Sequence, residues 1–256
     1  ARGTEGFATL EREGGKAFPD LDGLVRALEV PRTVWVMVPA GPPTQSVLVA
    51  LRQSLAPGDL VVDGGNSRYT DSVARAQAFA AREIGFVDAG TSGGIWGLEK
   101  GYCMMVGGTA EDVARLTPVL RDLAPPDGFL HTGPSGSGHY CKMVHNGIEY
   151  GMLQAYGEGF EILEKSAFTY DLAKVAHLWN QGSVVRSWLL DLTADALREN
   201  PTLQGIGAQV ADSGEGRWMV AEAVASDVPC PVITLSLLER IRSRVSDSFG
   251  NKMLAI

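Results

Sequence analysis

The sequence predicts an α/β fold with a doubly wound parallel sheet, followed by a domain that is all α. In the first half, short apolar runs rich in β-branched residues alternate with helical segments, which is typical of βαβ units around a mostly parallel sheet. From about residue 136 the strand signals fade and helical periodicity continues. A turn at Gly133-Pro134 separates these patterns, so we expect domains of residues 1–133 and 134–256.

The first domain divides into alternating strands and helices. The expected strands are residues 33–38, 60–63, 85–88 and 103–106, and the expected helices are residues 21–28, 46–55, 70–83 and 110–123. Polar or glycine-containing turns follow three of the strands, with the sequences PAG at 39–41, GGNS at 64–67 and GTSGG at 90–94. Ligands of open parallel sheets bind beyond the carboxyl ends of the strands, so we expect these turns to line a binding site.

The second domain is expected to consist of helices. One long helix over residues 136–165 comes first, and shorter helices follow at residues 173–180, 183–199, 218–225 and 233–245. Proline or glycine interrupts the pattern between them, which predicts loops at those places.

The composition narrows the class of protein. The chain has 256 residues, of which 45% are hydrophobic, as in a globular protein with a buried core. Its formal net charge of −8 gives no support for a nucleic-acid interface. Three scattered cysteines and four histidines without paired spacing lead us to expect reduced thiols and no metal site. No apolar run approaches the ~18 residues that a membrane span needs. We therefore expect a cytoplasmic protein that binds neither nucleic acid nor membrane.

A polar stripe runs along the start of the long expected helix. Lys142, His145, Asn146 and Glu149 are spaced i, i+3, i+4 and i+7, so on an α-helix they project from one face within two turns. An amine, an imidazole, an amide and a carboxylate can together position a polar substrate and move protons. The alternative is a solvated face with a charge pair, but two glycines in the same turns lower helix propensity and indicate close packing.

Four motifs occur in a fixed order along the chain. They are DGGNS at 63–67, SGG at 92–94, KMVHNGIEYG at 142–151 and GEGRW at 214–218. In this order they resemble the decarboxylating 6-phosphogluconate dehydrogenases, over residues 33–255. Residues 92–102 look more like the shorter branch of that family, whose members often prefer NAD over NADP.

The resemblance implies a fold and an activity. The fold would be a Rossmann-like dinucleotide-binding domain followed by a helical domain for substrate binding and dimerisation. The activity would be oxidative decarboxylation of 6-phospho-D-gluconate to ribulose 5-phosphate and CO2. The cofactor would be NAD or NADP, with NAD slightly favoured, and no metal would be needed.

The resemblance also implies the catalytic roles. Lys142 would act in its neutral form as the base for the hydroxyl proton, and once protonated it would hydrogen-bond the ketone as CO2 leaves. His145 and Asn146 would orient the sugar acid and polarise the reacting oxygen. Glu149 would donate a proton to C1 of the enediol, so it must hold its own proton at neutral pH, which desolvation favours.

Further residues are implied as substrate or cofactor contacts. The substrate contacts are Asn66, Ser92, Gly93, Gly94, Tyr150, Arg217 and Arg244, and the cofactor contacts are Val38, Pro39, Ala40 and Asn66. The tyrosine and the two arginines would bind the phosphate. Backbone N–H groups of the Ser-Gly-Gly turn would bind the substrate carboxylate, because glycines allow a close approach. For each turn residue, ordinary turn chemistry is the alternative interpretation.

The sequence also departs from the family pattern. Family members begin with a strand and a glycine-rich turn that bind the cofactor pyrophosphate, but no G-x-G-x-x-G occurs here, so we expect an incomplete dinucleotide-binding domain. Two alternatives are a related β-hydroxyacid dehydrogenase and a catalytically weak binding or assembly protein. His145 and Glu149 argue against the first, because simple oxidation needs no acid for an enediol. As in the family, we expect a homodimer or homotetramer.

Overall fold

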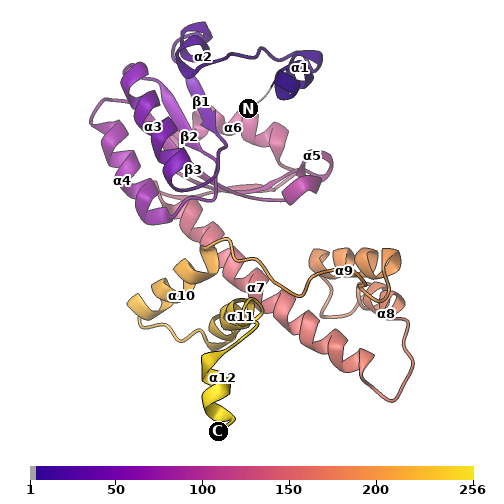
Figure 1. The fold of residues 1–256 in the computed structure, drawn as a ribbon. Coiled ribbons are helices and arrows are strands. Elements are labelled where there is room, and N and C mark those ends of the chain that lie inside the picture. The colour runs from indigo at the N-terminus through magenta and orange to yellow at the C-terminus, as the bar shows by residue number, and fades with distance from the viewer. Residues whose placement is uncertain (1–3) are drawn as a thin grey trace. The chain divides into compact units, whose positions relative to one another are not determined.

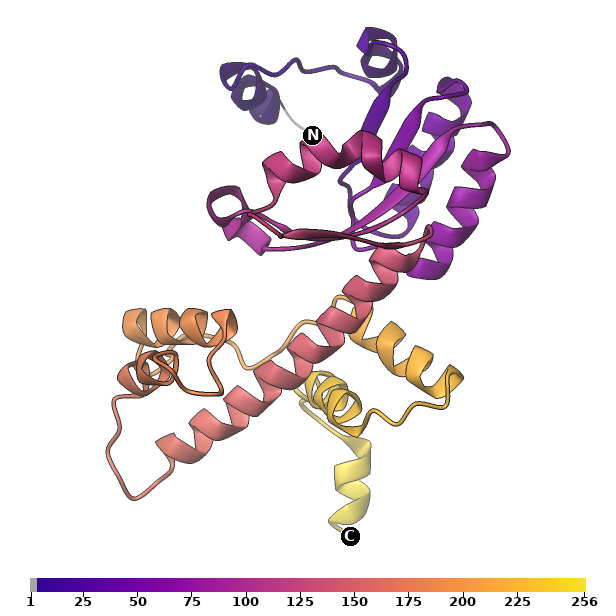
Figure 2. The ribbon, with the colours of Figure 1, turned by 180° about the vertical axis from the view of Figure 1, so that it is seen from behind.

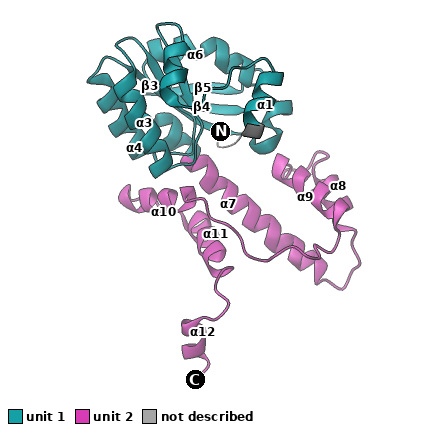
Figure 3. Ribbon diagram, turned by 45° about the horizontal axis from the view of Figure 1, so that its top comes forward, with its two compact units in different colours: residues 1–142 teal, residues 143–256 magenta. Residues whose placement is uncertain are grey.

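The structure is a computed structural model that describes residues 4–256. It divides into two compact units, residues 1–142 (unit 1) and residues 143–256 (unit 2), which Figure 3 shows in different colours. The division falls inside α7 (Ser137–Glu164), a single helix whose first turns belong to unit 1 and whose remainder belongs to unit 2.

Unit 1 contains a five-stranded sheet (Figure 1). Its strands are β1 (Thr33–Val36), β2 (Leu60–Asp63), β3 (Gly85–Ser92), β4 (Cys103–Gly107) and β5 (Phe129–Gly133), and they lie side by side in chain order. β1, β2 and β3 run parallel, β4 runs antiparallel to β3, and β5 runs parallel to β4. The prediction of a mostly parallel sheet is confirmed. The sequence did not indicate β5, because none of the five residues of this edge strand is buried and it lacks a clear apolar pattern.

Helices cover both faces of this sheet, as Figures 1 and 2 show from opposite sides. The helices of unit 1 are α1 (Thr4–Arg12), α2 (Leu21–Ala27), α3 (Pro42–Ser54), α4 (Tyr69–Ala80), α5 (Gly97–Lys100) and α6 (Ala110–Leu123). Successive strand residues point to opposite faces, so Val61 packs in a buried cluster with Leu51 of α3, whereas Val62 packs in another with Leu116 of α6. Burying each such side chain contributes about 1.5–3 kcal/mol. The doubly wound arrangement is thus confirmed.

Local signals set where these helices begin. Asp20 accepts the N–H of Gly23 at 2.6 Å at the start of α2, and Thr109 caps α6 in the same way. α3 begins at Pro42, before the predicted start at residue 46, because Gly41 adopts a φ of 88° and proline suits the first turn of a helix. Because β1, β2 and β3 are parallel, the turns after them open at one edge of the sheet.

Unit 2 consists of helices in the part of the chain that the structure describes. Beyond α7 they are α8 (Leu172–Trp179), α9 (Trp188–Glu199), α10 (Glu215–Ala225), α11 (Pro231–Arg242) and α12 (Phe249–Leu254). α8 and α9 pack on the C-terminal part of α7 through a cluster that includes Phe160 and Leu190. Every helix expected in this half is present, although α9 begins later than predicted because Ser187 caps it, and α12 was not expected. Among the described residues, no helix is both long and apolar enough to span a membrane.

Candidate functional site

A buried carboxylate ties the start of α7 to β3. The oxygens of Asp88, a fully buried residue of β3, accept the backbone N–H groups of Gly136 at 2.5 Å and of His139 at 2.8 Å. Burial raises the pKa of Asp88, while the charge of His139 and these N–H groups counteract part of the rise. An acid here also complements the positive end of the helix dipole. Asp88 therefore fixes the place where α7 leaves the sheet.

Lys142 lies on the second turn of α7 and is only 6% exposed. Gly90 of β3 makes room for it, because a Cβ added at Gly90 would stand 2.5 Å from the Cβ of Lys142 and 2.9 Å from the carbonyl oxygen of Gly138. Gly138 is equally constrained, since a Cβ there would collide with the carbonyl oxygens of Asp88 and Met105. Glycines at the crossing of helix and strand thus let the stem of this lysine lie against the backbone of β3.

The Ser92-Gly93-Gly94 turn lies where β3 ends. Ser92 is the last residue of the strand, and Gly93 and Gly94 follow with φ angles of 142° and 53°. Residues with a side chain rarely adopt these angles, so the glycines are needed for the turn. A Cβ at Gly93 would also stand 3.0 Å from the ring of Tyr102. The turn therefore presents backbone without side chains at the end of β3, the strand that also contains Gly90.

Two further turns lie at the carboxyl ends of β1 and β2. Residues 38–40 follow β1, and a carbonyl of this turn accepts the Thr44 hydroxyl at 2.9 Å. Gly41 precedes α3 without a side-chain cap, and because Pro42 and Pro43 carry no N–H, Thr44 has the first N–H group of this helix. After β2, Asn66 is exposed, whereas the Oγ of Ser67 is buried with no hydrogen-bond partner among the described residues. Among the described residues, the turn after β2 thus places an exposed amide and an unpartnered buried hydroxyl at this edge of the sheet.

The other residues of the polar stripe lie further along α7, in unit 2. Nδ1 of His145 lies 3.0 Å from Oδ1 of Asn146 and 3.9 Å from the carboxylate of Glu149. Asn146 is buried, whereas the side chains of His145 and Glu149 are each 37% exposed. Because α7 is continuous, the helical repeat sets Lys142 and these three residues along one side of it. An imidazole between an amide and a carboxylate can orient a substrate and exchange protons.

The three residues expected at the phosphate come together in unit 2, around the segment before α10. Oδ2 of Asp212, whose side chain is 2% exposed, accepts the Nε–H of Arg217 at 2.5 Å and lies 3.6 Å from a terminal nitrogen of Arg244. The hydroxyl of Tyr150 lies 3.3 Å from both the backbone nitrogen and the Oγ of Ser213. Asp212 and Ser213 thus contact side chains from α7, from α10 and from the segment after α11.

A third arginine belongs to this cluster, and the sequence did not single it out. The guanidinium carbon of Arg240 lies 3.6 Å from the ring centroid of Tyr150, in a cation–π contact, and a terminal nitrogen donates to the carbonyl of Ala211 at 2.8 Å. The run RIRSR at 240–244 offered three arginines, of which α11 presents Arg240 to Tyr150. Asp212 was missed as well, because an Asp-Ser-Gly sequence before a helix is ordinary turn chemistry.

Glycines bring α10 against Tyr150. A Cβ added at Gly216 would stand 2.5 Å from the Tyr150 ring, and Gly214 has a φ of 104° that allows the turn before the helix. Of the two glycines of the GEGRW motif, Gly216 therefore serves close packing and Gly214 serves the turn. Between them, Glu215 is buried with both carboxylate oxygens lacking a hydrogen-bond partner among the described residues.

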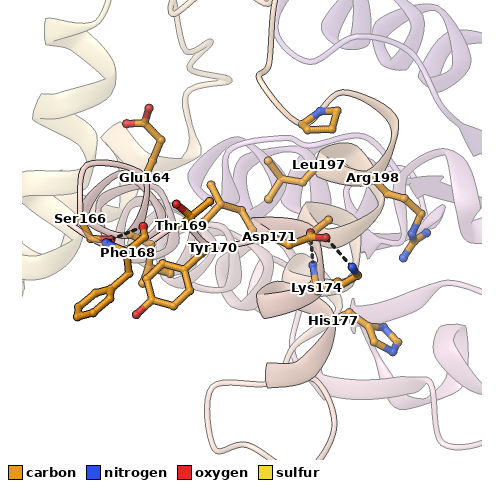
Figure 4. Close-up of a pocket in the computed structure, with 14 residues that line it drawn as sticks. Glu164, Ser166, Phe168, Thr169, Tyr170, Asp171, Lys174, His177, Leu197 and Arg198 are labelled. Carbon is orange, nitrogen blue, oxygen red and sulfur yellow. Dashed lines mark hydrogen bonds and ion pairs between the residues drawn. The ribbon is translucent and has the colours of Figure 1, made fainter.

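A separate cavity of about 830 Å³ opens at the C-terminal end of α7 (Figure 4). The loop after α7, α8 and the end of α9 line it, and Phe168 and Tyr170 lie on the loop. In its wall Asp171 accepts the backbone N–H of Lys174 and pairs with its amine, each at 3.0 Å. None of the site residues expected from the sequence lines this cavity.

Comparison with known families gives matches over both units. Residues 2–133 match the family described as the NAD binding domain of 6-phosphogluconate dehydrogenase. Residues 138–251 match the family described as the 6-phosphogluconate dehydrogenase C-terminal domain.

Individual relatives agree with these matches. A protein of Haloferax volcanii named as an NAD(+)-dependent, decarboxylating 6-phosphogluconate dehydrogenase is 45% identical over 251 residues, which cover 97% of this chain and 83% of the relative. A Bacillus subtilis protein named putative 6-phosphogluconate dehydrogenase YqeC is 44% identical over 96% of this chain and 82% of its own length. The solved Plasmodium falciparum 6-phosphogluconate dehydrogenase superposes with a TM-score of 0.84 at 29% identity, over 94% of this chain and 56% of that one.

Proposed function

The chain belongs to the 6-phosphogluconate dehydrogenase family, and we propose that it converts 6-phospho-D-gluconate into ribulose 5-phosphate and CO2 while reducing NAD(P)+. The observation that carries the proposal is the buried Lys142, set against Gly90 at the crossing of α7 and β3. We further propose that residues 1–133 bind the dinucleotide and residues 134–256 bind substrate and form the dimer.

The first step is oxidation of the C3 hydroxyl. Lys142 in its neutral form takes the hydroxyl proton as hydride leaves the same carbon. NAD(P)+, when bound, supplies the acceptor for that hydride. His145 and the buried Asn146 hold the sugar acid through hydrogen bonds, which their mutual contact at 3.0 Å preorganises.

The second step is loss of CO2 from the 3-keto acid. Protonated Lys142 hydrogen-bonds the ketone oxygen, so this oxygen can take up the electron pair of the breaking carbon–carbon bond and an enediol forms. Glu149 then gives a proton to the carbon that lost CO2, which becomes C1 of ribulose 5-phosphate, while Lys142, neutral again once the enediol has formed, takes the proton of the adjacent hydroxyl and leaves the ketone. The contact between Glu149 and His145 offers a route by which the acid regains its proton.

The substrate ends are assigned by chemistry. Ser92, Gly93 and Gly94 bind the carboxylate with a hydroxyl and backbone N–H groups, and the two φ angles of the glycines support such an approach. Tyr150, Arg217 and Arg244 bind the phosphate, which their convergence on residues 212–213 supports. Asn66 contacts both substrate and cofactor.

The residues at the carboxyl edge of the sheet fit a dinucleotide. Val38, Pro39 and Ala40 follow β1 at this edge, and the buried Oγ of Ser67 lacks a partner among the described residues. These groups suit the nicotinamide half of NAD(P)+ and its hydrogen-bonding edge. We favour NAD over NADP, because the similar Haloferax protein is named as NAD(+)-dependent.

The assembly we propose is a homodimer or homotetramer. α11 exposes Val232, Leu235 and Leu238, which lie at spacings of three along one side of the helix and would be covered by a second copy. The three free cysteines agree with a reducing, cytoplasmic location, which we also propose.

The direct test is turnover. The protein is incubated with 6-phosphogluconate and either NAD or NADP, while reduced-nicotinamide absorbance and pentulose phosphate are followed together. We expect equal amounts of both products and a higher kcat/KM with NAD. Oxidation of 3-hydroxyisobutyrate without turnover of 6-phosphogluconate would instead support the β-hydroxyacid dehydrogenase alternative.

A further inference from the structure

We propose that Asp212 is the positioning residue of the phosphate site, holding Arg217 and Arg244 in the geometry that recognises the substrate phosphate. This inference rests on the proposed function, since it concerns the same substrate. Asp212 does not itself touch the substrate, and no sequence pattern singled it out.

The position of Asp212 is itself fixed. Its Oδ1 accepts the backbone N–H of Gly214 at 3.0 Å, and its side chain is 2% exposed. Burial alone would raise the pKa of Asp212, but the Gly214 N–H together with Arg217 and Arg244 brings that pKa below its ordinary value. The carboxylate is therefore a fixed negative charge at neutral pH.

The two arginines gain orientation from this charge. Arg217 donates its Nε–H to Asp212, and its side chain is 53% exposed, so it would otherwise sample many rotamers. Within the described chain its two terminal nitrogens have no protein acceptor. They form the edge of the guanidinium that binds a phosphate bidentately. Arg244 reaches the same carboxylate oxygen at 3.6 Å and is 34% exposed.

The rest of the cluster depends on the same segment. Ser213 follows Asp212 and contacts the Tyr150 hydroxyl, while Ala211 precedes it and accepts from Arg240, which stacks on the Tyr150 ring. Through its neighbours, Asp212 therefore ties the expected phosphate residues to one short stretch of backbone.

Removing the charge of Asp212 would have two opposing effects on phosphate binding. Loss of a negative charge near the site would strengthen anion binding by Coulomb attraction. Loss of orientation would weaken it, because both arginines would have to be ordered when the phosphate binds. We expect the second effect to dominate.

The test compares Asp212→Asn with the wild type and with Asp195→Asn. The asparagine keeps the acceptor for the Gly214 N–H but loses the charge. The control removes the same kind of contact, a 2.7 Å pair between Asp195 and Arg198, from the exposed side of α9. Dissociation constants for 6-phosphogluconate and inorganic phosphate are measured by calorimetry, together with kcat and KM.

We expect Asp212→Asn to weaken binding of both anions by about tenfold and to raise KM equally, with kcat within about twofold of the wild type. Asp195→Asn should change none of these values, and Asp212→Glu should recover part of the affinity. Equal or tighter anion binding by Asp212→Asn, or a fall in kcat at unchanged KM, would overturn the inference. If the wild type fails to turn over 6-phosphogluconate, the proposed function fails, and inorganic phosphate binding still decides whether Asp212 organises an anion site.

Discussion

Gly90 and Lys142 lie so close together that a methyl group on Gly90 would stand 2.5 Å from the Cβ of the lysine. The obstruction would also involve backbone, since the carbonyl oxygen of Gly138 lies 2.9 Å from the same point. Gly90 of β3 thus sets how closely Lys142, the proposed base, can approach the edge of the sheet where substrate and cofactor are expected.

Gly90→Ala should therefore displace Lys142 and lower kcat by about a hundredfold, the scale associated with a misplacement of about 1 Å. The comparison is Gly157→Ala, on the same helix, where an added Cβ meets nothing within 4 Å. That control should retain its kcat and gain about 0.5–1 kcal/mol of stability, because alanine favours a helix over glycine. Steady-state kinetics and thermal unfolding of both variants test this pair, and a normal kcat in Gly90→Ala would contradict it.

Lys142→Met should reduce kcat by about 10³-fold or more while the dissociation constant for 6-phosphogluconate changes little. The thioether keeps much of the apolar stem but cannot accept or donate the proton. Lys174→Met removes an exposed lysine from α8 and serves as the control. Turnover is measured by CO2 release and binding by calorimetry. Near-normal CO2 release from Lys142→Met would exclude this lysine as the base.

Glu149→Gln should slow protonation of the enediol more than hydride transfer, with kcat falling by about 10² to 10⁴-fold. The amide keeps the size of the side chain and can still contact His145, but it has no acidic proton to give. Glu158→Gln, further along α7, is the matched control. Solvent deuterium incorporation at C1 of the product reports the step, and an unchanged rate of incorporation would remove Glu149 from its role.

Asp59→Asn should lower the free energy of unfolding of unit 1 by roughly 1–3 kcal/mol at neutral pH. The buried Asp59 carboxylate accepts the N–H groups of Arg32 at 2.6 Å and Ala56 at 2.9 Å, and it pairs with the Arg32 guanidinium at 3.1 Å. Burial opposes ionisation, yet these donors hold the pKa of Asp59 below its ordinary value.

The difference in unfolding free energy between the wild type and Asp59→Asn depends on pH, in a direction that follows from the lowered pKa of Asp59. Since the folded pKa of Asp59 lies below the unfolded one, the stabilisation is present above about pH 4 and is lost as the pH falls through the folded value. Urea titrations of wild type and Asp59→Asn at several pH values should show a gap that narrows only in acid. A gap that widened on acidification would contradict the assignment.

Leu235→Glu should weaken self-association, because it places a charge in the exposed apolar row of α11. Val119→Glu adds the same charge to an exposed position of α6 in unit 1 and should leave the assembly unchanged. Light scattering at micromolar concentration measures the mass of each. A monomeric wild type would refute the proposed homo-oligomer.

The sequence alone determined the order of β1 to β4 and of the helices α2 to α4 and α6 to α11, because apolar periods of two and of about 3.6 residues distinguish strands from helices before any packing is known. It indicated β1 to β4 and the long α7, together with the glycine turn after β3, since positive φ angles require particular residues. It also aligned the polar stripe of α7, which depends only on helical geometry.

The tertiary structure decided the contacts between residues distant in the chain, for which spacing carries no information. Asp88 anchors α7, and Gly90 admits Lys142, through the crossing of a strand and a helix that no local pattern specifies. Likewise Asp212 joins Arg217 and Arg244, and Arg240 rather than Arg242 covers Tyr150, because these depend on how α7, α10 and α11 pack. Local sequence determines which way a side chain leaves its own helix, and only packing determines what it meets there.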